Sequence, residues 1–198
     1  MHSLPVAIEA HARGLPEGGV VTAKSLMHLG TRVAVDQALS RLARQGRLLR
    51  IGRGAYVAAV SGKYGSRPPE PSRVVESLAQ TFGEVIVPHG AASANRLGLS
   101  LQVPLKPVYL TSGRSRYLKL GKLEVELRHA PRRVLNLGRG AVPEAIRALE
   151  WLGPRHGPAQ LPKLVTRLEA SQKQELLRAR PTMPTWLAAE VSRAIGRA

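Results

Sequence analysis

A dense cluster of proline and glycine at residues 61–72 divides the chain into two differently patterned regions. Proline lacks the backbone donor that helices and sheets use, and glycine costs conformational entropy in both, so regular structure does not continue through such a segment. We therefore expect a domain boundary there. The sequence predicts a first domain over residues 1–60, a linker over 61–72 and a second domain over 73–198.

The elements predicted for the first domain follow the order of a winged helix-turn-helix. Threonines at two helix starts are good N-caps, and a glycine after a helix favours a left-handed cap. The predicted elements are a helix at 4–13, a turn at 17–19, an extended segment at 20–21, helices at 22–29 and 31–45 ended by Gly46, and strands at 48–51 and 55–57.

The second domain has a less regular pattern, in which short apolar strands and amphipathic helices alternate before the chain becomes helical. The predicted elements are helices at 71–82 and 91–97, strands at 85–87, 108–111, 117–120 and 123–128, and helices from residue 143 onward, including 161–168, 172–178 and 185–195. The predicted fold class is α+β: an N-terminal winged helix-turn-helix followed by a mixed α/β domain with a helical C-terminal half.

The charge of the chain favours a polyanionic partner. Thirty lysines and arginines against 13 acidic residues give a net charge of +17. Aromatic residues make up only 4% of the chain, which argues against a single-strand binder that stacks bases. These figures leave binding to a duplex open, and both double-stranded DNA and a structured RNA read by its shape fit the charge.

Other sequence features exclude several classes of protein. There is no cysteine, so disulfides, thiolate zinc sites and cysteine nucleophiles are excluded. The apolar runs are short, and Glu9 interrupts the candidate N-terminal hydrophobic segment, so we expect no membrane span and no signal peptide. The sequence predicts a cytoplasmic protein.

The helix predicted at residues 31–45 has an apolar stripe and a polar face. The apolar side chains recur at the i, i+3, i+4, i+7 spacing of a core-facing helix: Val35, Ala38, Leu39 and Leu42. The opposite face suits the major groove, where glutamine pairs with adenine, arginine binds guanine or phosphate, and valine meets a thymine methyl. The alternative is a solvated helix face.

Position along this helix separates base readout from phosphate binding, because its N-terminal part reads bases in this motif. The predicted readout residues are Thr31, Arg32, Val33 and Gln37. Ser40 completes the outward face, and Arg41 and Arg44 are predicted phosphate contacts.

Two further cations of the first domain are candidates for DNA contact. Arg53 lies in the turn between Gly52 and Gly54, where an exposed arginine can enter a minor groove or bind phosphate. The alternative is an ordinary hairpin turn with a solubilising charge. Lys24, one helical turn before His28, is a candidate contact to the DNA backbone.

Positive charge also gathers around the predicted strands of the second domain. We expect these residues to form a second basic surface that extends the DNA contact or opposes a partner's effect; the alternative is a generally basic, solvated surface. The predicted members are Arg114, Arg116, Lys119, Arg128, Arg132 and Arg133.

Enzyme and metal signals are weak, and we predict no catalytic residue, metal or cofactor. Glu124 and Glu126 share one face of a predicted strand. Because they alternate with apolar neighbours, they are explained as the solvent-exposed face of a half-buried strand. The histidines are scattered without ligand spacing. The Gly-Arg-Gly run at 138–140 precedes a helix and could cradle an anion, although such a run is commonly a turn.

Several segments resemble the abortive-infection AbiE-type antitoxins, the transcriptional regulators of type IV toxin-antitoxin systems. They are residues 31–56 (TRVAVDQALSRLARQGRLLRIGRGAY), 90–99 (GAASANRLGL), 108–113 (VYLTSG) and 127–131 (LRHAP). The resemblance implies repression of the protein's own operon by the N-terminal domain. It also implies that the second domain is needed to counter a nucleotidyltransferase-like toxin.

The combined hypothesis is a non-enzymatic, DNA-binding antitoxin that represses its own promoter, with paired copies on repeated half-sites. The toxin would be a functional partner, with or without a stable complex. The alternative hypothesis is a winged-helix regulator whose second domain senses a small ligand and has no toxin partner.

Overall fold

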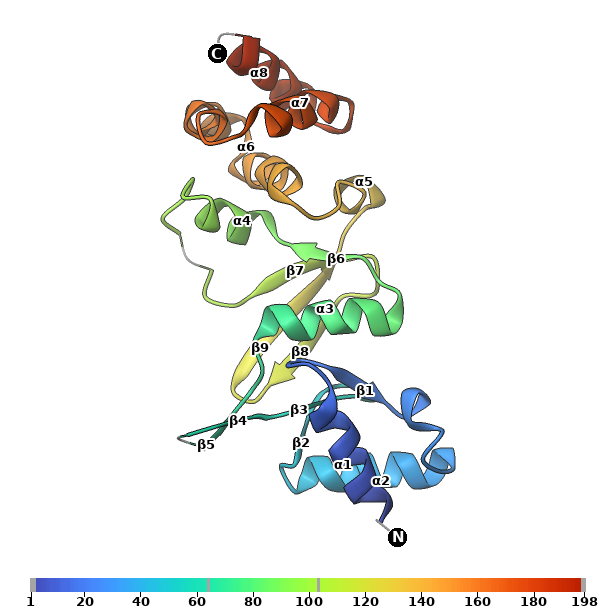
Figure 1. Cartoon of the computed structure of the whole chain (residues 1–198). Helices are drawn as coiled ribbons and strands as arrows, with labels where there is room; N and C mark the ends of the chain where they lie inside the picture. Colours follow the sequence, from blue (N-terminus) through green and yellow to red (C-terminus); the bar gives the residue numbers. More distant parts are fainter. Residues whose placement is uncertain (1–2, 64, 103, 197–198) are drawn as a thin grey trace. The chain divides into compact units, whose positions relative to one another are not determined.

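The computed structural model describes residues 3–63, 65–102 and 104–196 (Figure 1). They form mixed helix and sheet, as the predicted α+β class requires. The chain divides into two compact units, each made of two separate stretches of sequence. The first unit contains residues 1–86 and 115–127, and the second contains residues 87–114 and 128–198.

The first unit begins with helices and strands at nearly all of the predicted places. They are α1 (Leu4–Gly14), β1 (Val20–Thr22), the 3-10 turn η1 (Lys24–Leu26), α2 (Arg32–Arg44), β2 (Leu48–Gly52) and β3 (Ala55–Ala58). The three strands form an antiparallel sheet in the order β1-β3-β2. Tyr56 lies on the central strand and is in register with both Val21 and Arg50.

The helix predicted at residues 22–29 is wrong, because the structure has only the single 3-10 turn η1 followed by non-helical turns. Thr22 and Ser25 bond to each other's backbone amides, at 3.2 and 3.0 Å, and Leu29 bonds back to Leu26. Thr22 itself pairs with Ala55 in the sheet, so extended strand occupies the position where the predicted helix begins. The segment is therefore a tight connection before α2.

One apolar core holds these elements together. Fully buried Ile8 of α1, Leu39 and Leu42 of α2, and Leu48 of β2 belong to it. Burying each such side chain contributes on the order of 1.5–3 kcal/mol. The buried stripe of α2 is the one that its sequence period predicts, so the opposite face of α2 is free to meet solvent or a partner.

The first unit continues beyond the domain boundary that the proline and glycine cluster predicts. Its further elements are β4 (Val60–Gly62), β5 (Gly65–Arg67), α3 (Pro71–Phe82), β8 (Arg116–Leu120) and β9 (Leu123–His129), of which β9 leaves the unit after Leu127. The Ser77 hydroxyl on α3 accepts a hydrogen bond from the Val20 amide at 2.8 Å. The compact unit thus differs from the predicted domain 1–60, because α3 and the β8–β9 hairpin pack on the N-terminal elements.

The predicted linker is partly structured. Residues 60–62 and 65–67 pair as an antiparallel ribbon, and α3 begins at Pro71, where proline suits a first helical turn. Gly83 ends α3 with φ +66°, the left-handed cap expected there. Proline and glycine therefore mark turns and a helix start here, not a flexible connection.

The second unit combines short strands with a helical C-terminal half. Its elements are β6 (Ile86–Pro88), α4 (Gly90–Arg96), β7 (Val108–Thr111), α5 (Arg132–Leu135), α6 (Ala141–Val165), α7 (Ala170–Arg178), the 3-10 turn η2 (Arg180–Thr182) and α8 (Thr185–Gly196). The two strands are neighbours in their sheet, and α4, α6, α7 and α8 enclose a core that includes Ile146, Leu149 and Leu176.

The long helix α6 contains a break at Gly153, where φ is +70° and ψ is −179°. Pro154 follows directly, and proline disfavours helical geometry in the residue before it. The helix predicted at 161–168 is in fact the last part of α6 and ends at Val165. Within the described residues, no helix is both long and apolar enough to cross a membrane.

Candidate nucleic-acid interface

Local sequence fixes the start and the end of α2, the helix that carries most of the predicted site. Thr31 has extended backbone, and its hydroxyl accepts a hydrogen bond from the Ala34 amide at 3.4 Å. At the other end, Gly46 has φ +70°, and the Arg47 amide bonds back to the Leu42 carbonyl. These caps satisfy backbone groups that a helix leaves unpaired. They hold α2 at a defined length of 13 residues.

The outward face of α2 presents the polar side chains that the sequence predicts there. Val33 is 67% exposed. Gln37, Ser40, Arg41 and Arg44 are also exposed, and no other described residue forms a hydrogen bond or ion pair with their side chains. Each can therefore bind an external group without first breaking an internal contact.

The two residues at the start of α2 are already engaged. The Thr31 hydroxyl acts as the helix cap, and the Arg32 Nε donates to the Asp36 carboxylate at 2.8 Å. This i, i+4 pair is exposed at both ends, so it contributes only a few tenths of a kcal/mol. DNA phosphate or a guanine edge can still compete for Arg32, but the adjacent carboxylate opposes it.

The turn between β2 and β3 places Arg53 in solvent. Gly54 has φ +68°, whereas Gly52 is not left-handed, so only one of the two glycines is required by the turn. Lys24 is exposed on η1. His28 is also exposed, and its ring lies beside that of His11, with 5.6 Å between ring centroids.

The predicted second basic surface is divided between the two units. Arg116 and Lys119 belong to the first unit, and Arg114, Arg128, Arg132 and Arg133 belong to the second. Arg116 is 2.8 Å from the Glu84 carboxylate. Arg133 bonds to both Glu150, at 2.9 Å, and the Thr182 carbonyl, at 3.0 Å. The six residues therefore do not form one surface of a single compact unit, and at least two of them, Arg116 and Arg133, hold structural contacts.

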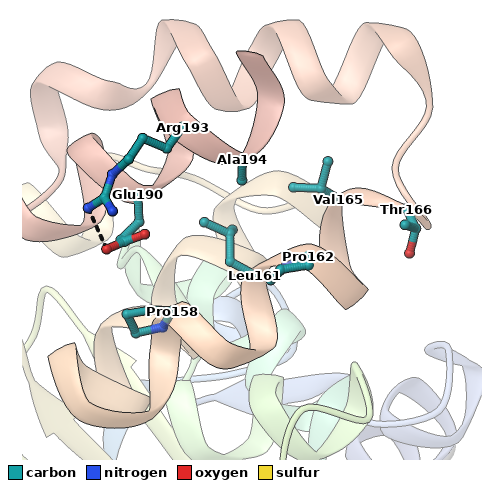
Figure 2. A pocket seen from close by; sticks show the side chains of 8 residues that line it. All are labelled: Pro158, Leu161, Pro162, Val165, Thr166, Glu190, Arg193 and Ala194. Atoms are coloured by element: carbon teal, nitrogen blue, oxygen red, sulfur yellow. Dashed lines mark hydrogen bonds and ion pairs between the residues drawn. The ribbon is translucent and has the colours of Figure 1, made fainter. Parts of the chain in front are cut away.

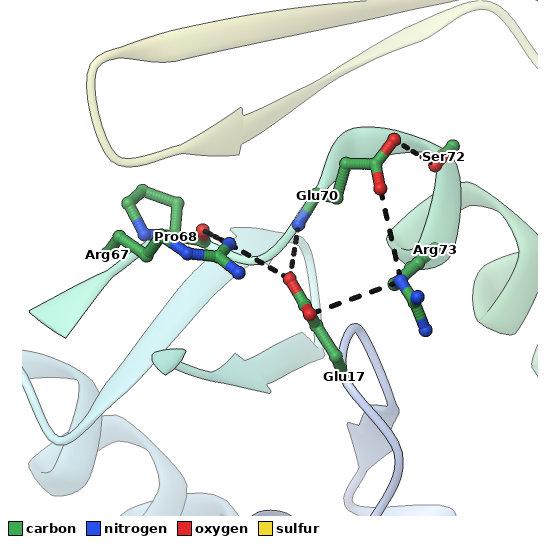
Figure 3. Close-up of polar contacts among 6 residues, drawn as sticks. All are labelled: Glu17, Arg67, Pro68, Glu70, Ser72 and Arg73. Atoms are coloured by element: carbon green, nitrogen blue, oxygen red, sulfur yellow. Dashed lines mark hydrogen bonds and ion pairs between the residues drawn. The ribbon is translucent and has the colours of Figure 1, made fainter. Parts of the chain in front are cut away.

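A polar network around Glu17 was not foreseen from the sequence. Its carboxylate accepts hydrogen bonds from the Arg67 guanidinium at 2.9 Å and the Glu70 amide at 3.0 Å, with Arg73 at 4.0 Å (Figure 3). The Arg67 hydrogen bond, followed by the Glu70 amide, lowers the pKa of Glu17 below its ordinary value of 4.5. The network ties the turn before β1 to the segment between β5 and α3.

Glu9 has a comparable role on α1. This side chain is buried, and its carboxylate pairs with Arg13, at 2.8 Å, and with Arg47. A buried carboxylate needs such partners, because unpaired burial of a charge is costly. Arg47 is therefore a structural residue of the first unit, although the basic composition of residues 41–53 would also suggest a DNA contact.

A small apolar pocket lies in the second unit, between the second half of α6 and α8 (Figure 2). Its volume is about 300 Å³. The lining is mostly apolar, with polar groups at Thr166 and at the Glu190–Arg193 ion pair, whose atoms are 2.6 Å apart. The apolar members are Pro158, Leu161, Pro162, Val165 and Ala194.

Among the residues that the structure describes, no three histidine or acidic side chains lie close enough together to hold a metal ion. Glu124 and Glu126 lie on β9 opposite Lys119 and Tyr117, while Val125 is fully buried between them. This alternation agrees with the interpretation of the two glutamates as the outer face of a half-buried strand.

Comparison with known proteins gives a fold relationship and a family. The crystal structure of the RV2827C protein from Mycobacterium tuberculosis matches with a TM-score of 0.56 and 16% sequence identity, over 99% of this chain and 77% of that chain. This similarity concerns the fold. No curated protein matches the sequence. A family model matches residues 7–177, most of the sequence, and the chain therefore belongs to the family of unknown function DUF6088.

Proposed function

We propose that the N-terminal elements α1 to β3 act as a winged helix that binds double-stranded DNA sequence-specifically, with α2 in the major groove. The observation that carries this proposal is the outward face of α2, where Gln37, Arg41 and Arg44 are exposed and have no partner among the described residues. A helix of this size fits the major groove of B-DNA, and glutamine and arginine read its base edges or bind phosphate.

Two further observations support the same function. The order helix, strand, turn, helix, strand, strand, with the sheet order β1-β3-β2, agrees with a winged helix-turn-helix whose second helix is reduced to the turn η1. Exposed Arg53 occupies the turn of the β2–β3 hairpin, the position of the wing. The net charge of +17 supplies the long-range attraction to DNA.

The regulated DNA is proposed to be the promoter of the protein's own operon. Fluorescence anisotropy with a duplex from the upstream region and a scrambled duplex tests this, across a salt series. We expect a preference of more than about 100-fold for the upstream duplex at physiological salt. Gln37→Ala should reduce that preference by about 5- to 150-fold, the range of one bidentate base contact.

Controls separate readout from general charge. Gln80→Ala changes an exposed glutamine on α3 and should leave the preference unchanged. Arg53→Ala should weaken binding to both duplexes if it contacts phosphate. Equal affinity of wild type for the two duplexes contradicts sequence-specific repression. Tighter binding to a structured RNA competitor than to DNA would identify RNA as the ligand.

The second part of the proposal is that the protein counters a nucleotidyltransferase-like toxin, which the resemblance to AbiE-type antitoxins supports. Co-expression with such a toxin from an adjacent gene should restore growth. Arg132→Gln is a suitable variant, because Arg132 is exposed and has no side-chain partner among the described residues. Full rescue by this variant removes Arg132 from the mechanism, and no rescue by wild type removes the antitoxin role.

The pocket between α6 and α8 favours one alternative function, a regulator that senses a small ligand. Its mainly apolar lining with the Glu190–Arg193 pair is typical of sites for small amphipathic molecules, although 300 Å³ is at the lower limit for such sites. Under this alternative, a compound that raises the melting temperature also changes DNA affinity. Ala194→Leu, which fills the pocket, should abolish both effects.

A further inference from the structure

A buried arginine in the second unit has an unsatisfied hydrogen-bonding edge. Arg147 of α6 is only 2% exposed. Its Nη1 donates to the Gly138 carbonyl at 2.9 Å, whereas Nε and Nη2 have no hydrogen-bond partner among the residues that the structure describes. Buried polar atoms are nearly always hydrogen-bonded, so two free donors on one buried charged group require an explanation.

The free atoms are the two that suit an oxyanion. The N–H bonds of Nε and Nη2 point in the same direction from one edge of the planar guanidinium group. This edge binds the two oxygens of a carboxylate or phosphate group in a bidentate manner. The bond from Nη1 to Gly138 holds the plane of the group, so the free edge is fixed in orientation before any ligand arrives.

The nearby carboxylates do not fill this edge. Glu144 pairs with Arg96, and Glu150 pairs with Arg133 at 2.9 Å. Neither forms a hydrogen bond to Arg147. Burial lowers the pKa of Arg147 despite the attraction of these two glutamates, because the charged form loses its solvation. The buried cation is therefore only partly compensated within the described part of the chain.

The guanidinium group also lies beside the amino end of a helix. Gly138 and Gly140 have φ values of +75° and +129°, and α6 begins at Ala141. The first amides of a helix have no carbonyl partner inside it, and the helix dipole makes this end positive. A cation is unfavourable there, whereas an anion would be stabilised by both the helix end and Arg147.

We propose that Arg147 and the amino end of α6 form a binding site for an oxyanion, the phosphate or carboxylate group of a small molecule. The Gly138 carbonyl that holds Arg147 belongs to a loop, residues 138–140, that is exposed or half-exposed, so the guanidinium group is bonded to a segment that reaches the protein surface. This site is distinct from the pocket between α6 and α8 and does not depend on DNA binding.

Thermal unfolding and calorimetry of the full-length protein test the site, with inorganic phosphate and acetate as probes at matched ionic strength. Because the net charge is +17, anions also bind elsewhere, so the comparison with variants is decisive. At about 100 times its Kd, phosphate should raise the wild-type Tm by about 5 °C or more. Arg147→Met should lose most of this shift, whereas Arg155→Met, at an exposed position of the same helix, should retain it.

Each outcome bears on the proposal. A phosphate-specific shift that requires Arg147 identifies a phosphoryl ligand, and an equal shift with acetate shows that the site accepts either oxyanion; both support the site. Equal shifts in wild type and Arg147→Met, or no shift with either probe, overturn it. If Arg147→Met does not fold, Arg147→Lys keeps the charge without the planar edge and should bind the effective probe at least about tenfold more weakly.

Discussion

Replacing two arginines of α2 and measuring the salt dependence of DNA binding tests the geometry of the proposed complex. This measurement is more direct than a loss of affinity at one salt concentration. Arg41 and Arg44 are exposed and have no internal ion pair among the described residues, so each is free to neutralise one phosphate. The double change Arg41→Gln and Arg44→Gln removes both charges while keeping long polar side chains and a good helix former.

The expected effect follows from counterion release. Each phosphate neutralised on B-DNA contributes about −0.9 to the slope of log K against log salt concentration, so the double variant should lose about 1.8 from the magnitude of the slope. A fourfold rise in salt, from 50 to 200 mM, weakens DNA binding by both proteins. The factor by which the affinity falls should be about 12 times smaller for the double variant than for wild type. The preference for the upstream duplex should change little, because phosphate contacts carry no sequence information.

Anisotropy titrations at several salt concentrations measure both quantities. Arg155→Gln with Arg178→Gln is the matched control, since it removes the same charge from exposed positions in the second unit. Arg32→Gln is a second control, whose slope should change less because Asp36 already pairs with Arg32. An unchanged slope in the α2 variant, or an equal change in the first control, would refute the placement of α2 on DNA.

Two further predictions concern stability. Gly90→Ala should lower the free energy of unfolding by about 3 kcal/mol, because a Cβ there would meet the Arg147 carbonyl and lie 2.6 Å from the Trp151 Cβ. Urea unfolding measures this change. The control Gly14→Ala, whose added Cβ has no neighbour within 4 Å, should be neutral or stabilising. The lowered pKa of Glu17 should stabilise the fold above pH 4.5 and lose that effect as the pH falls through the folded-state value, so the urea midpoints of wild type and Glu17→Gln should converge in acid; a constant difference contradicts this.

Local signals in the sequence predicted most elements, because those signals act within a few residues. The cap at Thr31, the left-handed Gly46 and the buried stripe from Val35 to Leu42 all lie where the pattern places them. The boundaries of the compact units could not be predicted in this way. They depend on α3 and the β8–β9 hairpin packing on the N-terminal elements, a choice made by contacts between distant residues.

In the candidate site, too, the features set by local sequence could be predicted, and those set by contacts between distant residues could not. Exposure of Gln37 and Arg41 follows from the period of α2, and the structure places both outside the core. The pairing of Arg116 with Glu84 and of Arg133 with Glu150 involves partners 32 and 17 residues away, which a count of charges does not reveal. The burial of Arg147 was missed for the same reason, since arginine on a helix is ordinarily exposed.

The division of each unit into two stretches of chain has a consequence for synthesis on the ribosome. The first unit includes residues 115–127, so it cannot complete its packing when residue 86 has been made. At about 5–20 residues per second, the interval to residue 127 lasts about 2–8 s. During this time the N-terminal elements lack the β8–β9 hairpin, while part of the second unit has already been translated. The first unit can therefore complete its packing only after residue 127 has been made, and the second unit only after residues 128–198 have followed.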